Sequence, residues 1–96
     1  MKAVFIAYNE AVDEEVSEAL EECGVAQFTK WTRVLGKGGN SGPHMLTAVW
    51  PKGNHVVFAA LEDDTARKLM DQIRHLRTEI GHEGVKGFLL PVEDIT

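Results

Sequence analysis

Two short segments of this 96-residue chain are apolar on both alternating sets of positions, and they constrain its fold more than any other feature. They are residues 2–8 (KAVFIAY) and residues 55–61 (HVVFAAL). A strand with one solvated face alternates apolar and polar residues, whereas a strand covered on both faces does not. Both segments are therefore predicted to be central strands of a sheet that is covered on its two faces.

Two amphipathic helices are predicted between and after these strands. The first follows Asn9, a suitable capping residue, and ends at Gly24; the second follows residues 62–64, which offer a capping Asp, and ends at Gly81. The polar side of the second helix carries His75. The apolar stripes, at helical spacing, contain Val12, Val16, Ala19, Leu20 and Cys23 in the first helix, and Ala66, Leu69, Met70, Ile73, Leu76 and Ile80 in the second. Cys23 is therefore expected to be a core residue and not a reactive thiol.

The remaining strands complete a familiar order of elements. Residues 25–35 predict a long second strand, 45–50 (MLTAVW) a short strand that pairs back, and 86–92 (KGFLLPV) a final strand whose Pro91 favours a sheet edge or strand end. The order is β-α-β-β-α-β in a single domain spanning residues 1–96. It predicts a ferredoxin-like α+β fold, a four-stranded antiparallel sheet with both helices on one face.

The second face of this sheet needs a cover that the chain does not supply. Both helices lie on one face, yet the strands at 2–8 and 55–61 are apolar on both. Because an exposed apolar sheet face promotes aggregation, another copy of the chain is the simplest cover. The sequence therefore predicts a homo-oligomer.

Charge is distributed unevenly along the chain. Residues 25–61 contain no Asp or Glu and four Lys or Arg, although the formal net charge of the protein is −5. One basic segment in an acidic protein favours a small anion, or an acidic patch on a partner protein, over nucleic acid. The single cysteine excludes an internal disulfide, and the N-terminal segment is neither a signal peptide nor a membrane span. A cytoplasmic protein is expected.

The glycine-rich stretch from Gly36 to Gly42 is the first candidate binding element. Its four glycines in seven residues would let successive N–H groups converge on an anion, and Lys37 would add positive charge. The stretch fits neither a Walker loop nor a dinucleotide fingerprint, since it has no Gly-Lys-Ser/Thr and Ser41 stands where a glycine is needed. Two interpretations stay open, an anion-binding nest and a flexible turn.

His44 is a candidate metal ligand, because a three-fold axis would bring three copies of it together. In one chain, His44, His55 and the distant Cys23 do not form a metal site. An enzyme is not expected: the loop has no carboxylate to act as a base, and nothing activates Ser41. Size and topology are also those of acylphosphatase, whose loop after the first strand is missing here.

Three segments resemble the P-II signalling superfamily, and the resemblance covers essentially the whole chain. EALEECGV resembles the end of the first P-II helix, and RVLGKGGN resembles the entry to the T-loop. KGFLLPVED resembles the final strand of the family. In this match, Lys86 corresponds to the lysine of the family's B-loop and Phe88 to the family's phenylalanine. Pro43-His44, Trp50-Pro51 and Asn54 resemble, more narrowly, the short-loop P-II homologues, whose role is uncharacterised.

The resemblance implies a homotrimer that binds a small ligand, such as ATP or ADP, in clefts between subunits. It implies a loop over residues 36–54 that docks on a target protein such as a transporter or an enzyme, with membrane association only through a transporter partner. Gly39 and Asn40 stand where the family has arginine and glutamine, and the C-terminal arginine pair is absent. The resemblance thus predicts a ligand cleft but leaves the ligand, adenine nucleotide or other, unnamed.

The function predicted from the sequence is a non-enzymatic P-II-like regulator with a ligand cleft formed by the 36–44 loop and the Lys86 region. The alternative is a trimeric metal-binding protein that uses His44. The residues assigned to the ligand are Gly36, Lys37, Gly38, Gly39, Asn40 and Lys86.

Overall fold

A computed structural model of the chain describes residues 1–38, 42–44, 53–81 and 84–96. Four strands form the main sheet: β1 (Lys2–Asn9), β2 (Thr29–Val34), β5 (Asn54–Leu61) and β6 (Val85–Pro91). Their order across the sheet is β2-β5-β1-β6. Each neighbouring pair is antiparallel, with β1 between β5 and β6. This is the predicted ferredoxin-like arrangement, and β6, with Pro91 at its end, is an edge strand as predicted.

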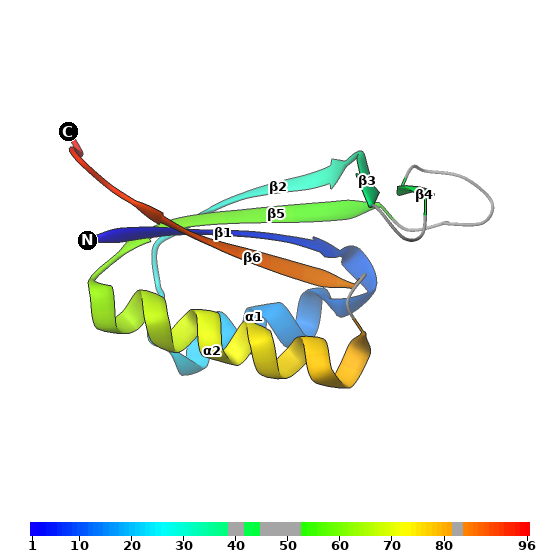
Figure 1. The fold of residues 1–96 in the computed structure, drawn as a ribbon, viewed down its shortest axis with the longest axis horizontal. Helices are drawn as coiled ribbons and strands as arrows, with labels where there is room; N and C mark the ends of the chain where they lie inside the picture. Colours follow the sequence, from blue (N-terminus) through cyan, green and yellow to red (C-terminus); the bar gives the residue numbers. More distant parts are fainter. Residues whose placement is uncertain (39–41, 45–52, 82–83) are drawn as a thin grey trace.

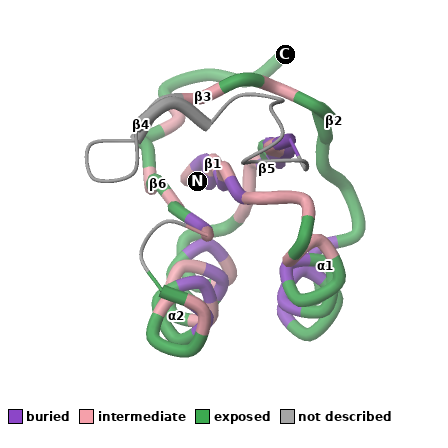
Figure 2. Tube along the Cα trace, turned by 90° about the vertical axis from the view of Figure 1, so that its right-hand side faces the viewer, coloured by how far each residue is buried: buried purple, intermediate pink, exposed green. Residues whose placement is uncertain are grey.

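Both helices pack on the same face of this sheet (Figures 1 and 2). A 3₁₀ turn, η1 (Glu10–Val12), leads from β1 into α1 (Asp13–Glu22), and α2 (Asp63–Ile80) connects β5 to β6. Asn9 caps η1 by accepting a 2.8 Å hydrogen bond from the Ala11 amide. Among the described residues, no helix is long and apolar enough to cross a membrane.

Each helix ends just before the glycine that was predicted to terminate it. Gly24 and Gly81 have φ angles of 73° and 94°, which residues with a side chain adopt at a cost. The Gly24 and Val25 amides return to the Glu21 and Leu20 carbonyls at 3.0 and 2.9 Å, closing α1 with a turn. The capping Asp expected for the second helix is not found, because the N-cap residue of α2 is Glu62 and its side chain makes no capping hydrogen bond.

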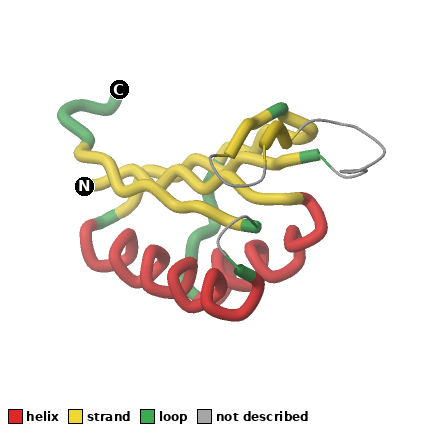
Figure 3. The backbone as a smooth tube through the Cα atoms, turned by 45° about the vertical axis from the view of Figure 1, so that its right-hand side comes forward, coloured by secondary structure: helices red, strands yellow, loops and turns green. Residues whose placement is uncertain are grey.

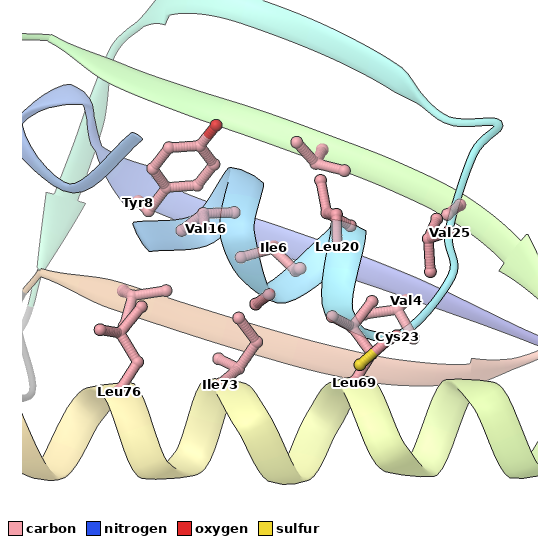
Figure 4. Close-up of a cluster of buried hydrophobic side chains, with 14 of the residues drawn as sticks. Val4, Ile6, Tyr8, Val16, Leu20, Cys23, Val25, Leu69, Ile73 and Leu76 are labelled. Carbon is pink, nitrogen blue, oxygen red and sulfur yellow. The ribbon is translucent and has the colours of Figure 1, made fainter. Parts of the chain in front are cut away.

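The core lies between the sheet and the two helices (Figure 4). Every second residue of β1 points into it, and the cluster also takes side chains from both helices and from two further strands. Its buried members are Val4, Ile6, Tyr8, Val16, Ala19, Leu20, Cys23, Val25, Val57, Ala59, Ala66, Leu69, Ile73, Leu76 and Val85. Cys23 is free and buried, as predicted for a core residue, and burial raises the pKa of its thiol.

The second strand is shorter than the 25–35 predicted from the sequence. β2 begins at Thr29, because residues 25–28 carry the chain from the helix layer back to the sheet (Figure 1). Its pairing with β5 shifts between Trp31 and Val34, where Arg33 has a φ of 56°. The strand predicted over residues 45–50 lies outside the described residues.

Candidate functional site

Two of the residues predicted to bind a ligand, Gly36 and Lys86, lie near the same end of the main sheet, where β1 and β2 end and β5 and β6 begin. In the register, Asn9 and Val34 both pair with Asn54, and Tyr8 pairs with Val85. Backbone hydrogen bonds of 2.9 Å join the Asn9 amide to the Gly84 carbonyl and the Glu10 amide to the Gly53 carbonyl. The start of η1 thus ties together the two chain segments that enter β5 and β6.

A short hairpin, here called the arm, leaves this end after β2 (Figure 3). It consists of β3 (Gly36–Gly38) paired antiparallel with β4 (Gly42–His44), with Lys37 opposite Pro43. The sequence predicted a glycine-rich loop here, whereas part of it is a two-stranded ribbon. In such a ribbon half of the N–H groups still point away from the partner strand. The arm backbone therefore keeps donors that could serve an anion.

Gly36 has a structural role as well as a predicted binding role. A Cβ atom added at this position would meet the Nδ2 atom of Asn54 at 3.0 Å, closer than nearly all real contacts. The glycine thus lets the first residue of the arm lie against the beginning of β5. The sequence predicted Gly36 as part of a glycine-rich, anion-binding stretch and gave no sign of this contact.

Lys86 is exposed on β6, on the face of the sheet opposite the helices. Its Nζ atom lies 5.6 Å from the centre of the Phe88 ring, a cation–π distance. The strands β1 and β5 separate β6 from β2, so Lys86 and the strand that carries the arm are about 14 Å apart across the sheet. Within one subunit, the sheet itself does not bring Lys86 and the start of the arm together.

The face that carries Lys86, here called the open face, is covered by neither helix (Figure 2). Phe5, Phe58 and Phe88 pair across β5, β1 and β6, and the Phe5 and Phe88 rings meet edge to face with centres 6.0 Å apart. Phe58, on the central strand β5, is 36% exposed, and Phe88, on the edge strand β6, is 42% exposed. Trp31 and Leu90 are also exposed among its residues. The prediction of a sheet with two apolar faces is thus confirmed.

A polar cluster under the same end of the sheet was missed by sequence reasoning. The Tyr8 hydroxyl donates to Asp13 Oδ1 at 2.6 Å, and Lys30 Nζ donates to the same oxygen at 2.7 Å. Burial alone would raise the pKa of Asp13, but the hydrogen bonds from Lys30 and Tyr8 outweigh it and lower that pKa. One signal was available: a tyrosine in a buried strand needs a partner for its hydroxyl, and an Asp begins the next helix.

His55 belongs to this cluster and is buried, with 9% of its surface exposed. Its ring stands perpendicular to that of Tyr8 with centres 5.6 Å apart. Its Nδ1 atom accepts a 3.4 Å hydrogen bond from the Arg33 amide, and its Nε2 atom lies 3.8 Å from Glu10 Oε2. His55 thus contacts β1, η1 and β2 at the point where the arm begins.

The other predicted residues are placed as follows. His44 ends β4 opposite Gly36, and Gly39 and Asn40 lie outside the described residues, as do the side chains of Lys37 and His44. The residues with a described placement include no group of three or more His, Cys, Asp or Glu able to hold a metal ion. Metal binding by His44 stays a prediction. His75, predicted to lie in solvent, is exposed and lies 2.9 Å from Glu79.

The solved structures that share this fold include those of two PII-like proteins. CPII, a nitrogen regulatory PII-like protein from Thiomonas intermedia K12 bound to ADP, AMP and bicarbonate, has a TM-score of 0.69 and 19% identity, over 99% of this chain and 94% of that chain. CPII bound to ADP and bicarbonate has a TM-score of 0.71 and 19% identity, over 97% and 88%. A putative PII-like signaling protein from Thermus thermophilus has a TM-score of 0.65 and 15% identity, over 92% and 82%.

At these identities the solved structures establish the fold alone. A comparison with curated proteins gives no match. The sequence model of the family described as Nitrogen regulatory protein P-II, however, matches residues 1–96, the whole of the chain. The chain therefore belongs to the nitrogen regulatory protein P-II family.

Proposed function

We propose that this protein is a P-II-type regulator that assembles as a homotrimer and binds a small anionic ligand at the boundary between its subunits. One observation carries the proposal. Lys86 stands on the apolar open face, toward the end of the sheet from which the arm leaves. Assembly through that face would place a lysine of one subunit beside a glycine-rich arm of the next.

The argument for assembly rests on the open face. Phe58, Phe88 and Trp31 keep between a third and a half of their surface exposed in the single chain. Burying such a side chain completely from water is worth roughly 1.5–3 kcal/mol, so covering the exposed third to half of one ring contributes about 0.5–1.5 kcal/mol. A second and third copy would cover these rings by the same contacts in each subunit, as closed symmetry requires.

The argument for an anionic ligand rests on charge and on backbone donors. Lys86 and Lys37 would attract the ligand, and the amides of Gly36, Gly38, Gly39 and Asn40 would donate to it. ADP, AMP and bicarbonate, which CPII binds in its solved structures, are all anions. Within one chain, Lys86 lies about 14 Å from β2, because two strands separate β6 from β2. This distance favours a site that a neighbouring subunit completes.

The output of the regulator would be a partner protein, such as a transporter or an enzyme, contacted by the 36–54 loop. Membrane association would come only through such a partner. We assign no catalysis to the protein, and we place it in the cytoplasm. In the family to which the chain belongs, regulation is the shared activity.

Titration calorimetry with ADP, AMP, bicarbonate and phosphate tests the ligand proposal. Losing one charge-assisted contact of about 1.5–3 kcal/mol should weaken binding roughly ten- to a hundredfold in Lys86→Ala and in Lys37→Ala. Lys68→Ala, which removes an exposed cation from α2, is the matched control and should bind as the wild type does. If neither Lys37→Ala nor Lys86→Ala changes the affinity, the ligand site lies elsewhere.

A further inference from the structure

The buried ring of His55 is a titratable group that the proposed ligand site does not use. It lies at the beginning of β5, on the helix side of the sheet, and its side chain is 11% exposed. It is one of four histidines, and it lies 22 residues along the chain from Arg33, the residue whose amide it accepts. A histidine is the side chain whose charge ordinarily changes between about pH 5 and pH 8.

The charged and titratable groups around this ring come from four elements. From β1, Tyr8 presents its ring to that of His55. From η1, Glu10 lies 3.8 Å from Nε2, and from α1 the Asp13 carboxylate interacts with His55 through its charge. From β2 come the Arg33 amide and Lys30, whose ammonium is bonded to Asp13 and offsets that carboxylate.

The hydrogen bond from Arg33 decides which protonation state of His55 the structure holds. A ring nitrogen that accepts a hydrogen bond carries no proton, so the neutral ring has its proton on Nε2, on the side of Glu10. Protonation would put a second proton on Nδ1, against the Arg33 N–H. Two donors then face each other, while the imidazolium is attracted to Glu10. Protonation therefore weakens the contact with β2 and strengthens the contact with η1.

The backbone at Arg33 depends on support from outside. Its φ of 56° makes it the one non-glycine residue with a positive φ in the part of the chain that the structure describes. It lies in the register shift between Trp31 and Val34, three residues before Gly36, where the arm starts. A left-handed non-glycine residue persists where its surroundings hold it, and at Arg33 the surroundings include His55.

We propose that His55 is a proton-sensitive latch for the beginning of the arm. Neutral His55 accepts from the Arg33 amide and holds the left-handed turn that directs the chain from β2 into β3. Protonated His55 pairs with Glu10 and releases the Arg33 amide, so acidification loosens the arm at its origin. This regulation goes beyond the proposed function, because it requires neither the ligand nor the trimer.

Amide hydrogen exchange measured residue by residue by NMR on the ligand-free protein tests the latch. Exchange is normalised to the intrinsic rate at each pH, and the ¹⁵N shifts of the His55 ring are recorded in parallel. We expect the protection of the Arg33 amide to fall about two- to tenfold between about pH 8 and pH 5, the range for the loss of one hydrogen bond. The fall should follow the titration of His55. Protection that stays constant while His55 titrates would overturn the latch, and so would a His55 ring that stays neutral throughout.

Three variants separate the latch from general effects of pH. Glu10→Gln removes the charge that receives the protonated ring, so the loss of Arg33 protection should move to lower pH together with the His55 titration. His55→Asn offers an oxygen near the position of Nδ1 but does not titrate, so Arg33 protection should become independent of pH. His75→Gln removes the exposed histidine beside Glu79 and should change nothing. If Glu10→Gln shifts the His55 titration but leaves the pH dependence at Arg33 in place, the latch is wrong.

Discussion

The hydroxyl of Tyr8 donates a 2.6 Å hydrogen bond to Asp13 Oδ1, the same oxygen that accepts 2.7 Å from Lys30. One carboxylate oxygen thereby connects β1, α1 and β2 below the beginning of the arm. Burial, followed by the hydrogen bond to Asp13 and its negative charge, raises the pKa of Tyr8 above its ordinary value of 10.0. The consequences can be measured because the chain has a single tyrosine.

The native protein should keep Tyr8 protonated at about pH 11, where a free tyrosine is mostly ionised. Because the native pKa is raised, the unfolded chain releases this proton first, and stability falls as pH rises above about 10. Ultraviolet absorbance should show no tyrosinate until the protein unfolds, and protein in guanidinium should titrate near pH 10. Native protein that ionises in the same range as the denatured chain would contradict the buried hydrogen bond.

The pKa of Asp13 is shifted in the opposite direction to that of Tyr8, so Asp13 should contribute to denaturation by acid and not by alkali. Its native pKa is lowered, so its contribution to stability is present above the unfolded value of about 3.9 and is lost as pH falls toward the native one. In urea unfolding, Asp13→Asn should be less stable than the wild type near neutral pH, and the difference should shrink below about pH 4. Glu18→Gln, on the exposed side of α1, is the control and should show neither effect. A difference that is the same at all pH values would argue against the charge as its origin.

Assembly can be tested at two neighbouring residues of β5. Phe58 is 36% exposed on the open face, whereas Val57 is 1% exposed and points to the helices. Phe58→Asp should weaken the proposed trimer by several kcal/mol while α1 and α2 remain folded, because an unpaired charge would be buried at the interface. Val57→Asp should instead unfold the chain. Sedimentation equilibrium and circular dichroism measure the two outcomes, with about three times the 10.6 kDa chain mass expected for the wild type.

A Phe58→Asp protein that sediments as a trimer as stable as the wild type would show that the open face is covered by something other than a second copy. A wild-type protein that is monomeric at micromolar concentration would reject the trimer itself. Thr29 pairs with Phe58 in the register, and Thr29→Asp on the edge strand β2 serves as a milder variant of the same test.

Replacing Arg33 with glycine should relieve the left-handed backbone. At a φ of 56°, a residue with a Cβ atom has an unfavourable energy of about 1–2 kcal/mol. Glycine removes this strain from the folded state, but it also gives the unfolded chain more conformational entropy, which cancels part of the gain. Arg33→Gly should therefore leave the free energy of unfolding unchanged or raise it by up to about 1 kcal/mol. Arg33→Ala keeps the strain and is the control for loss of the side chain. If urea unfolding finds Arg33→Gly less stable than Arg33→Ala, the turn is not strained.

Local patterns in the sequence were enough to predict the secondary structure that they span. The alternating apolar sets gave the central strands at 2–8 and 55–61, observed as Lys2–Asn9 and Asn54–Leu61, and Gly24 and Gly81 marked the ends of the helices. The second strand was predicted too long, because its first four residues are needed to cross between layers. Periodicity reports which side of an element is apolar, and it carries no information on such a crossing.

The sequence by itself determined the ferredoxin-like order of elements and the apolar second face, because both follow from which residue types recur at which spacing. Only the tertiary structure decided that Phe58, and not Val57, is exposed, and that Lys86 shares its face. The hydrogen bonds between Tyr8 and Asp13 and between Arg33 and His55 could also be found only in the tertiary structure. Strand register and the left-handed backbone at Arg33 determine them. Hydrogen bonds of this kind depend on distances of a few tenths of an ångström between separate elements, and no pattern along the chain encodes them.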